Sequence, residues 1–198
     1  MDTVSKAPVT MCFSKASLAA GTTSTISTTG TTTYAIESVF YSKTAITNGA
    51  TPTTDWVTGN AFVPIPIPLT ATGLAAGVPG PVSGYACAFT IGFDNAGNVK
   101  AIQGPIMGLD ANGNFISGSP TLNPALGPNG PNPGSIAGGV QANNNFCPIG
   151  AIVVKLGSTA VATWTFGSNN WAGVTGVTTS FLDLVSLPEG ALSNLTYA

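Results

Sequence analysis

Short strand-like segments separated by turns make up most of this chain, and no stretch of about twelve residues has the apolar spacing of a helix. Three such segments in the last third, residues 147–157, 159–167 and 176–188, are rich in the β-branched and aromatic residues that favour strands. Turns rich in Gly and Asn separate them. The pattern predicts a single all-β domain over residues 1–198, built as an antiparallel β-sandwich or a jelly-roll-like barrel.

One turn motif occurs twice in the middle of the chain. Residues 93–99 and 109–115 both contain an apolar residue, Asp, two variable residues, Gly, Asn and a second apolar residue. Asp94 and Asp110 can accept hydrogen bonds from the backbone that follows, and the glycine can adopt the positive φ of a tight turn. We therefore predict a hairpin turn at each copy. Neither copy has the downstream Glu of a calcium-binding EF loop, so we predict no metal site.

The first third predicts another hairpin. Residues 21–43 are rich in Thr, Ile, Val, Tyr and Phe, and Gly30 lies where a turn would fall. Beyond Gly30, residues 34–41 carry apolar side chains at both odd and even positions. We therefore expect residues 34–41 to form one strand that lies between two layers.

Proline-rich segments interrupt this pattern. Residues 61–69 have Pro at every second position, which removes alternate backbone N–H donors and excludes a central strand. The segment can be an edge strand that closes the chain's own core, or an extended arm that contacts another molecule. As an arm it would present four apolar residues on one side, and with Phe62 these are our candidate interface residues: Val63, Ile65, Ile67 and Leu69. Residues 119–145 are rich in Pro, Gly and Asn, and we predict that they form a long irregular loop. This loop would be either an intersubunit contact or a flexible insertion.

The chain is poor in charged side chains. It has five Lys, no Arg, no His and seven acidic residues, so charged residues make up 6% of the sequence, where about 25% is usual. Phosphate-backbone binding needs clustered cations, so we predict no nucleic-acid partner. No apolar stretch reaches the roughly 18 residues of a membrane-spanning helix, and we expect no membrane partner. A net charge of −2 favours self-association and contact with protein neighbours.

No motif in the sequence indicates an enzyme. The absence of His removes the usual general base near neutral pH and the commonest metal ligand. A glycosidase needs two facing carboxylates, which could in principle come from Glu37, Asp55, Asp94, Asp110 and Asp183. Turns and strand positions already explain several of these residues, and no nucleophile elbow, phosphate loop or dinucleotide motif occurs. We predict that the chain is not an enzyme and uses no cofactor.

Three cysteines, Cys12, Cys87 and Cys147, lie far apart in the sequence and form no recognisable metal-binding pattern. We predict small buried thiols, with a disulfide as the alternative.

Aromatic residues indicate a second kind of function. Asn169, Asn170 and Trp171 lie in a predicted turn, where an exposed tryptophan ring could stack on a sugar. They are our candidate contacts for a glycan-binding module. The alternative is that Trp171 closes one end of the core, where Trp164 is also expected from its alternating strand.

Two C-terminal stretches, residues 146–155 and 169–190, resemble small virion structural proteins of tailed bacteriophages, in particular capsid decoration (cement) proteins. The first stretch has a Cys-Pro-x-Gly turn that leads into an apolar strand. The second has a Phe-x-Asp segment followed by Leu-Pro. The matching residues are Cys147, Pro148, Gly150, Phe181, Asp183, Leu187 and Pro188.

The resemblance implies a non-enzymatic protein that binds the outer surface of a phage head and stabilises the shell. Its partners would be the major capsid protein and copies of itself, commonly as a homotrimer, and it would be assembled into virions in the host cytoplasm. Two alternatives stay open at this stage. One is a receptor- or glycan-binding module of a tail or head fibre, and the other is a cell-surface or secreted bacterial β-domain.

Overall fold

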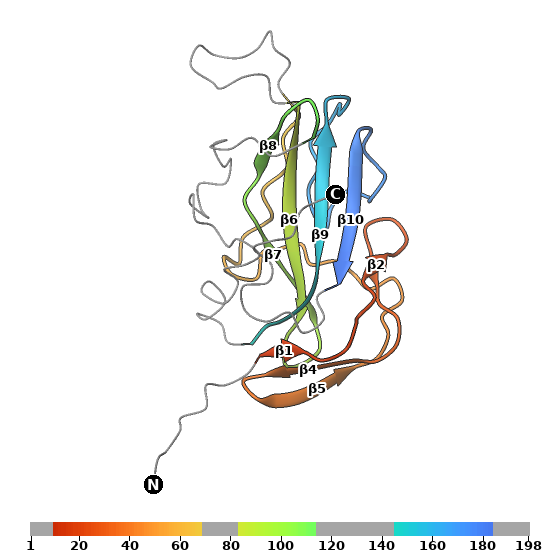
Figure 1. Cartoon of the computed structure of the whole chain (residues 1–198), viewed down its shortest axis with the longest axis vertical. Coiled ribbons are helices and arrows are strands. Elements are labelled where there is room, and N and C mark those ends of the chain that lie inside the picture. Colours follow the sequence, from red (N-terminus) through yellow and green to blue (C-terminus); the bar gives the residue numbers. More distant parts are fainter. Residues whose placement is uncertain (1–9, 69–82, 114–144, 184–198) are drawn as a thin grey trace.

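The computed structural model of the chain describes residues 10–68, 83–113 and 145–183, and the fold is given for these residues. They form strands and no helix, and all paired strands are antiparallel (Figure 1). The prediction of an all-β antiparallel fold is therefore confirmed. The strands are β1 (Met11–Cys12), β2 (Ala19–Ala20), β3 (Ile26–Ser27), β4 (Thr32–Ile36), β5 (Val39–Lys43), β6 (Gly84–Phe93), β7 (Val99–Gln103), β8 (Met107–Leu109), β9 (Cys147–Gly157) and β10 (Val177–Asp183).

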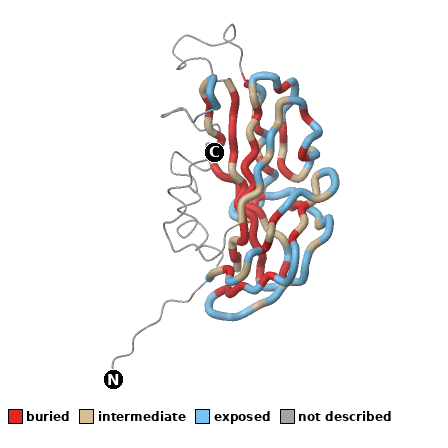
Figure 2. Tube along the Cα trace, turned by 45° about the vertical axis from the view of Figure 1, so that its right-hand side comes forward, coloured by how far each residue is buried: buried red, intermediate tan, exposed pale blue. Residues whose placement is uncertain are grey.

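A long sheet forms the centre of the molecule, with the strand order β10-β9-β6-β7 and with β8 pairing β6 next to β7. Its central strand β6 is almost entirely buried (Figure 2). The odd residues of β6, from Tyr85 to Phe93, belong to the hydrophobic core and all except Cys87 are large, whereas its even residues are Gly, Ala and Thr. The sheet therefore has one bulky face, which other parts of the chain must cover.

A β-bulge in β9 lets this strand follow the bulky face of β6. Ile91 pairs with Gly150 and Gly92 pairs with Pro148, so Ile149 is an extra residue on β9. Beyond the bulge, Phe89 pairs with Ile152, and both side chains lie on the core face. Gly150 is needed here because a Cβ at this position would lie 2.6 Å from the backbone oxygen of Leu182 and 2.8 Å from Leu18 Cδ2.

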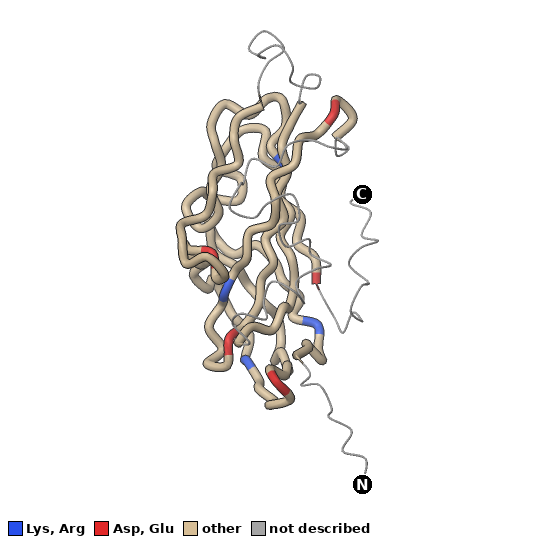
Figure 3. The backbone as a smooth tube through the Cα atoms, turned by 90° about the vertical axis from the view of Figure 1, so that its left-hand side faces the viewer, with Lys and Arg blue, Asp and Glu red and all other residues tan. Residues whose placement is uncertain are grey.

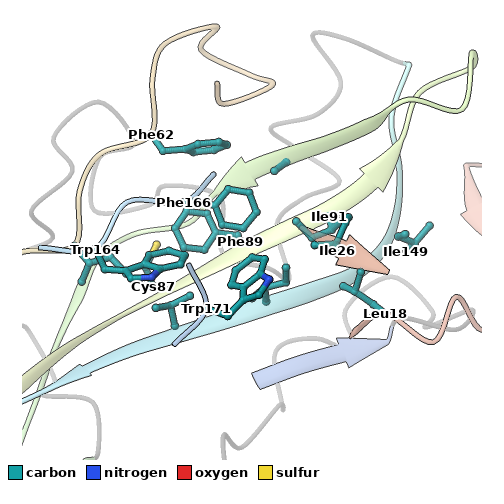
Figure 4. Packing of buried hydrophobic residues seen from close by; sticks show 14 of the residues in the cluster. Leu18, Ile26, Phe62, Cys87, Phe89, Ile91, Ile149, Trp164, Phe166 and Trp171 are labelled. Atoms are coloured by element: carbon teal, nitrogen blue, oxygen red, sulfur yellow. The ribbon is translucent and has the colours of Figure 1, made fainter. Parts of the chain in front are cut away.

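Aromatic side chains on irregular backbone cover this face (Figure 4). Phe166 stacks on Phe89 of β6 with the ring centres 4.5 Å apart. Trp164 packs beside Trp171 with 5.9 Å between their ring centres. The prediction of a strand over residues 159–167 is wrong, because the segment makes only one bridge, between Trp164 and Ile65. Its partner segment is rich in proline and lacks the N–H groups that a longer ladder would need.

A small sheet, β1-β4-β5, packs at one end of the long sheet (Figure 1). Its hairpin turn is at Glu37 and Ser38, which have φ values of 50° and 67°. The expected strand over residues 34–41 is therefore wrong, since the chain reverses in its middle. Positive φ at both turn residues gives the twist that a two-residue hairpin loop needs. Gly30, where the turn was predicted, has φ 72° and lies just before β4. As a result β5 is an edge strand and does not lie between two layers.

The Asp94 turn has the predicted structure. Asp94 Oδ1 accepts hydrogen bonds from the backbone N–H groups of Ala96 at 2.9 Å and Asn98 at 2.8 Å, and Gly97 has φ 75°. The turn joins β6 to β7, so this hairpin is confirmed. In the second copy, Asp110 Oδ1 accepts from the N–H of Asn112 at 2.8 Å, but the residues after 113 lie outside the described ranges.

Acid should weaken the Asp94 turn. Burial alone raises the pKa of Asp94, but hydrogen bonds from Asn98 and Ala96 and the charge of Lys100 outweigh it, so the pKa lies below its ordinary value of 3.8. The carboxylate therefore stabilises the fold fully above this ordinary value, and the contribution is lost as the pH falls through the lower, folded-state pKa.

We expect Asp94→Asn to destabilise the chain by about 1–2 kcal/mol at neutral pH and by progressively less below about pH 4. Denaturant unfolding of both chains at several pH values measures this difference. If the two chains differ in free energy of unfolding by the same amount at pH 3 and pH 7, the ionised Asp94 carboxylate does not stabilise the turn.

The three cysteines are free and buried, as predicted. The Sγ atom of Cys87 lies 3.3 Å from the backbone oxygen of Gly104. Burial raises the pKa of Cys87 to about 12, which keeps its thiol protonated and unreactive.

Candidate functional site

The proline-rich segment packs on the chain's own core with a period of three residues. Phe62, Ile65 and Pro68 are buried, whereas Val63 is half-buried and Ile67 is 39% exposed. The expectation that Val63, Ile65 and Ile67 share one side is therefore wrong. Proline favours the polyproline II conformation, which has three residues per turn and not two. Leu69 lies outside the described residues.

Two anchors hold this segment to the domain. The N–H of Ile65 donates to the oxygen of Trp164 at 2.8 Å, and the N–H of Trp164 donates back at 3.1 Å. The side-chain amide of Gln103 makes a similar pair of hydrogen bonds to the backbone of Val63. Its Oε1 accepts from the Val63 N–H and its Nε2 donates to the Val63 oxygen, both at 2.8 Å. Of the candidate interface residues that are described, Ile67 thus has the most exposed side chain.

Sequence reasoning missed Gln103, whose side chain is almost completely buried in this role. Its own N–H donates to Asp55 Oδ2 at 2.7 Å, while Asp55 Oδ1 accepts from the N–H groups of Val57 and Thr58. Asp55 therefore orders one loop and also fixes the strand that carries Gln103. The sequence did contain one sign of a buried polar role, since Gln103 follows two apolar residues and directly precedes Gly104.

The candidate glycan contacts also hold the core together. Trp171 is 7% exposed, and its Nε1–H donates to the oxygen of Thr25 at 2.6 Å. Asn169 Oδ1 accepts from the N–H of Thr165 at 2.7 Å, and the backbone oxygen of Asn170 accepts from Trp164 Nε1 at 3.2 Å. The Trp171 ring also packs against three other aromatic rings, so its faces are not open to a sugar.

The aspartates considered as catalytic groups are bonded to backbone. Each accepts at least one backbone hydrogen bond, Asp183 from the N–H of Leu18 at 2.8 Å and Asp55, Asp94 and Asp110 in their turns. Glu37 lies in the β4–β5 turn and is exposed. The four aspartates therefore have structural partners. Within the described ranges, no group of three or more His, Cys, Asp and Glu residues could hold a metal ion.

A surface pocket of about 460 Å³ lies between residues 51–56, Gly59, Val99 and Lys100. Lys100 Nζ lies 4.4 Å from the centre of the Trp56 ring and 3.6 Å from Asp94 Oδ2. The pocket offers threonine hydroxyls and one ammonium group. Its carboxylate, Asp55, accepts backbone hydrogen bonds at both oxygens.

The other surface feature is apolar and lies on the small sheet. Phe13, Val39 and Phe40 are 42%, 54% and 74% exposed, and the Phe13 and Phe40 rings stack with their centres 5.3 Å apart. We call the two stacked rings, Phe13 and Phe40, the end surface. They lie on the face of the small sheet that carries Ala35, because Ala35 pairs with Phe40, and Ala35 is buried; Val39 pairs with Ile36 and lies on the other face. Sequence reasoning placed Phe40 between two layers and so missed this surface.

Charged groups are sparse over the described part of the molecule (Figure 3). No helix in that part of the chain is long and apolar enough to cross a membrane. Comparisons with protein-family models, with curated proteins and with solved structures found no match to this chain.

Proposed function

We propose that the chain is a non-enzymatic virion structural protein, most simply a capsid decoration protein that binds the outside of a phage head. The observation that carries the proposal is the combination of a nearly uncharged chain with stacked, exposed aromatic rings at one end. Exposed apolar surface of this kind marks sites of contact with other proteins. The sequence resemblance to decoration proteins supplies the kind of partner.

The mechanism is selective binding. Each bound copy lowers the free energy of the assembled shell but not that of dissociated capsid subunits, so it resists disassembly. Contacts with few charges also depend little on salt. The end surface is the candidate docking site, because it lies at one end of the long sheet and leaves most of the domain away from the shell (Figure 1).

Binding to particles tests the proposal. Purified chain is added to phage particles that lack it, and the bound copies and the temperature of genome release are measured. We expect saturable binding and a higher release temperature for the wild type, and loss of both for Phe40→Ser. Val161→Ser is the matched control, since Val161 is 75% exposed, close to the 74% of Phe40, but belongs to another segment. Particles that bind no wild-type chain would contradict the proposal.

A further inference from the structure

The outer edge of β5 carries backbone groups that no described residue pairs. Among the described residues β5 has one neighbour, β4, with the pairs Ile36–Val39, Ala35–Phe40 and Tyr34–Tyr41. In a two-residue hairpin the pair next to the turn is hydrogen-bonded, and such pairs then alternate along the strand. The N–H and C=O groups of Phe40 and Ser42 therefore point away from β4.

This edge has little protection against pairing at Phe40 and Ser42. Natural edge strands are often blocked by proline, by a bulge or by charged side chains, including charges that point inward. The one charged residue of β5 is Lys43, whose Cδ and Nζ atoms lie 3.2 and 3.6 Å from the place of a Cβ on Gly97. Its side chain thus extends over the β6–β7 turn, and the edge at Phe40 and Ser42 stays open.

We propose that two copies of this chain associate through β5, which pairs antiparallel with β5 of the second copy about a two-fold axis. The register that uses all the outward groups pairs Phe40 of each copy with Ser42 of the other. Tyr41 then faces Tyr41 of the second copy on the axis. This arrangement forms four backbone hydrogen bonds and joins two three-stranded sheets into one.

The charges of the hairpin fit this register. Glu37 in the turn and Lys43 at the end of β5 are its two charged residues. Lys43 faces Val39 of the second copy, and rotation of its flexible side chain away from its own β6–β7 turn would bring the ammonium group to that copy's Glu37; the same contact is repeated across the axis. Opposite charges at diagonal positions of neighbouring strands attract each other, whereas two lysines in this register stay at opposite ends of the strand pair.

The same pairing brings the end surfaces together. Side chains of adjacent strands share a face, so the stacked rings of Phe13 and Phe40 from each copy would form one apolar stripe across the axis. This inference does not depend on the proposed function, because it concerns the purified chain alone. If the proposed function holds, the dimer would present two end surfaces to the shell where a single copy presents one.

Sedimentation of the purified full chain over a range of concentrations tests the pairing. We expect a monomer–dimer equilibrium, and we expect Ser42→Pro to remain monomeric with an unchanged circular dichroism spectrum, because the Ser42 N–H points outward and is not needed by β4. A chain that stays monomeric up to about 1 mM, or that forms a trimer, would overturn the proposal.

A charge exchange tests the register without relying on proline. Glu37→Lys replaces attraction by repulsion at two symmetric contacts, so the dimer dissociation constant should rise by about 5- to 30-fold. Adding Lys43→Glu to the same chain restores opposite charges and should recover most of the affinity. Equal affinities for all three chains would overturn this register.

Discussion

Replacing Trp164 by alanine should lower the free energy of unfolding by about 3–5 kcal/mol. The Trp164 side chain is fully buried, and its ring lies 6.0 Å from Phe89, 6.2 Å from Phe166 and 5.9 Å from Trp171 between ring centres. Removing it leaves a cavity in the middle of the aromatic layer. It also leaves the backbone oxygen of Asn170 without the Nε1–H donor at 3.2 Å.

Chemical denaturation of Trp164→Ala and Val161→Ala measures this effect. Val161 lies in the same segment but is 75% exposed, so its replacement should change stability by less than about 0.5 kcal/mol. If both variants lose the same small amount, the aromatic layer does not cover the sheet as described.

Gln103→Leu should destabilise the fold by about 2–4 kcal/mol. The substitution keeps the approximate volume of the side chain but leaves the N–H and the oxygen of Val63 without their partners. Prolines at 64, 66 and 68 cannot supply replacement donors, so the whole segment should loosen. Thermal melting and proteolysis near residues 62–68 would report both effects.

Asn145→Leu is the control for Gln103→Leu. The Asn145 amide also makes two hydrogen bonds, to the N–H and the Oδ1 of Asn95, but these are exposed to water. Water can replace them, so the cost should stay below about 1 kcal/mol. Equal losses for the two variants would show that burial does not govern the contribution of Gln103.

Turn chemistry and apolar runs made part of this fold predictable. The predicted segment 147–157 coincides with β9, and the Asp94 turn forms the expected hairpin because its Asp and Gly act locally. Asp94 and Asp110, predicted as turn residues, accept backbone hydrogen bonds inside their turns, and the three thiols are buried as predicted.

Other features of the fold had no recognisable signal in the sequence. The β4–β5 turn uses Glu37 and Ser38 at positive φ, which no turn residue in the sequence signals. Residues 62–68 follow a period of three, because proline fixes their conformation independently of any sheet. Gln103 serves a segment 40 positions earlier in the chain, and the exposure of Phe40 follows from the misplaced turn.

These observations support a binding role. Aspartates that could have formed a catalytic pair order turns and loops, and the candidate glycan ring of Trp171 is buried. Two features of the described surface meet at Phe40, the end surface and the open edge of β5. Both are suited to contact with protein.

The most direct test of the proposed function is density-gradient fractionation of a phage lysate that contains this chain, followed by quantitative mass spectrometry. We predict that the chain migrates with DNA-filled heads at a fixed ratio to the major capsid protein. Recovery of the chain only among soluble proteins, with none in the particle band, would contradict the account.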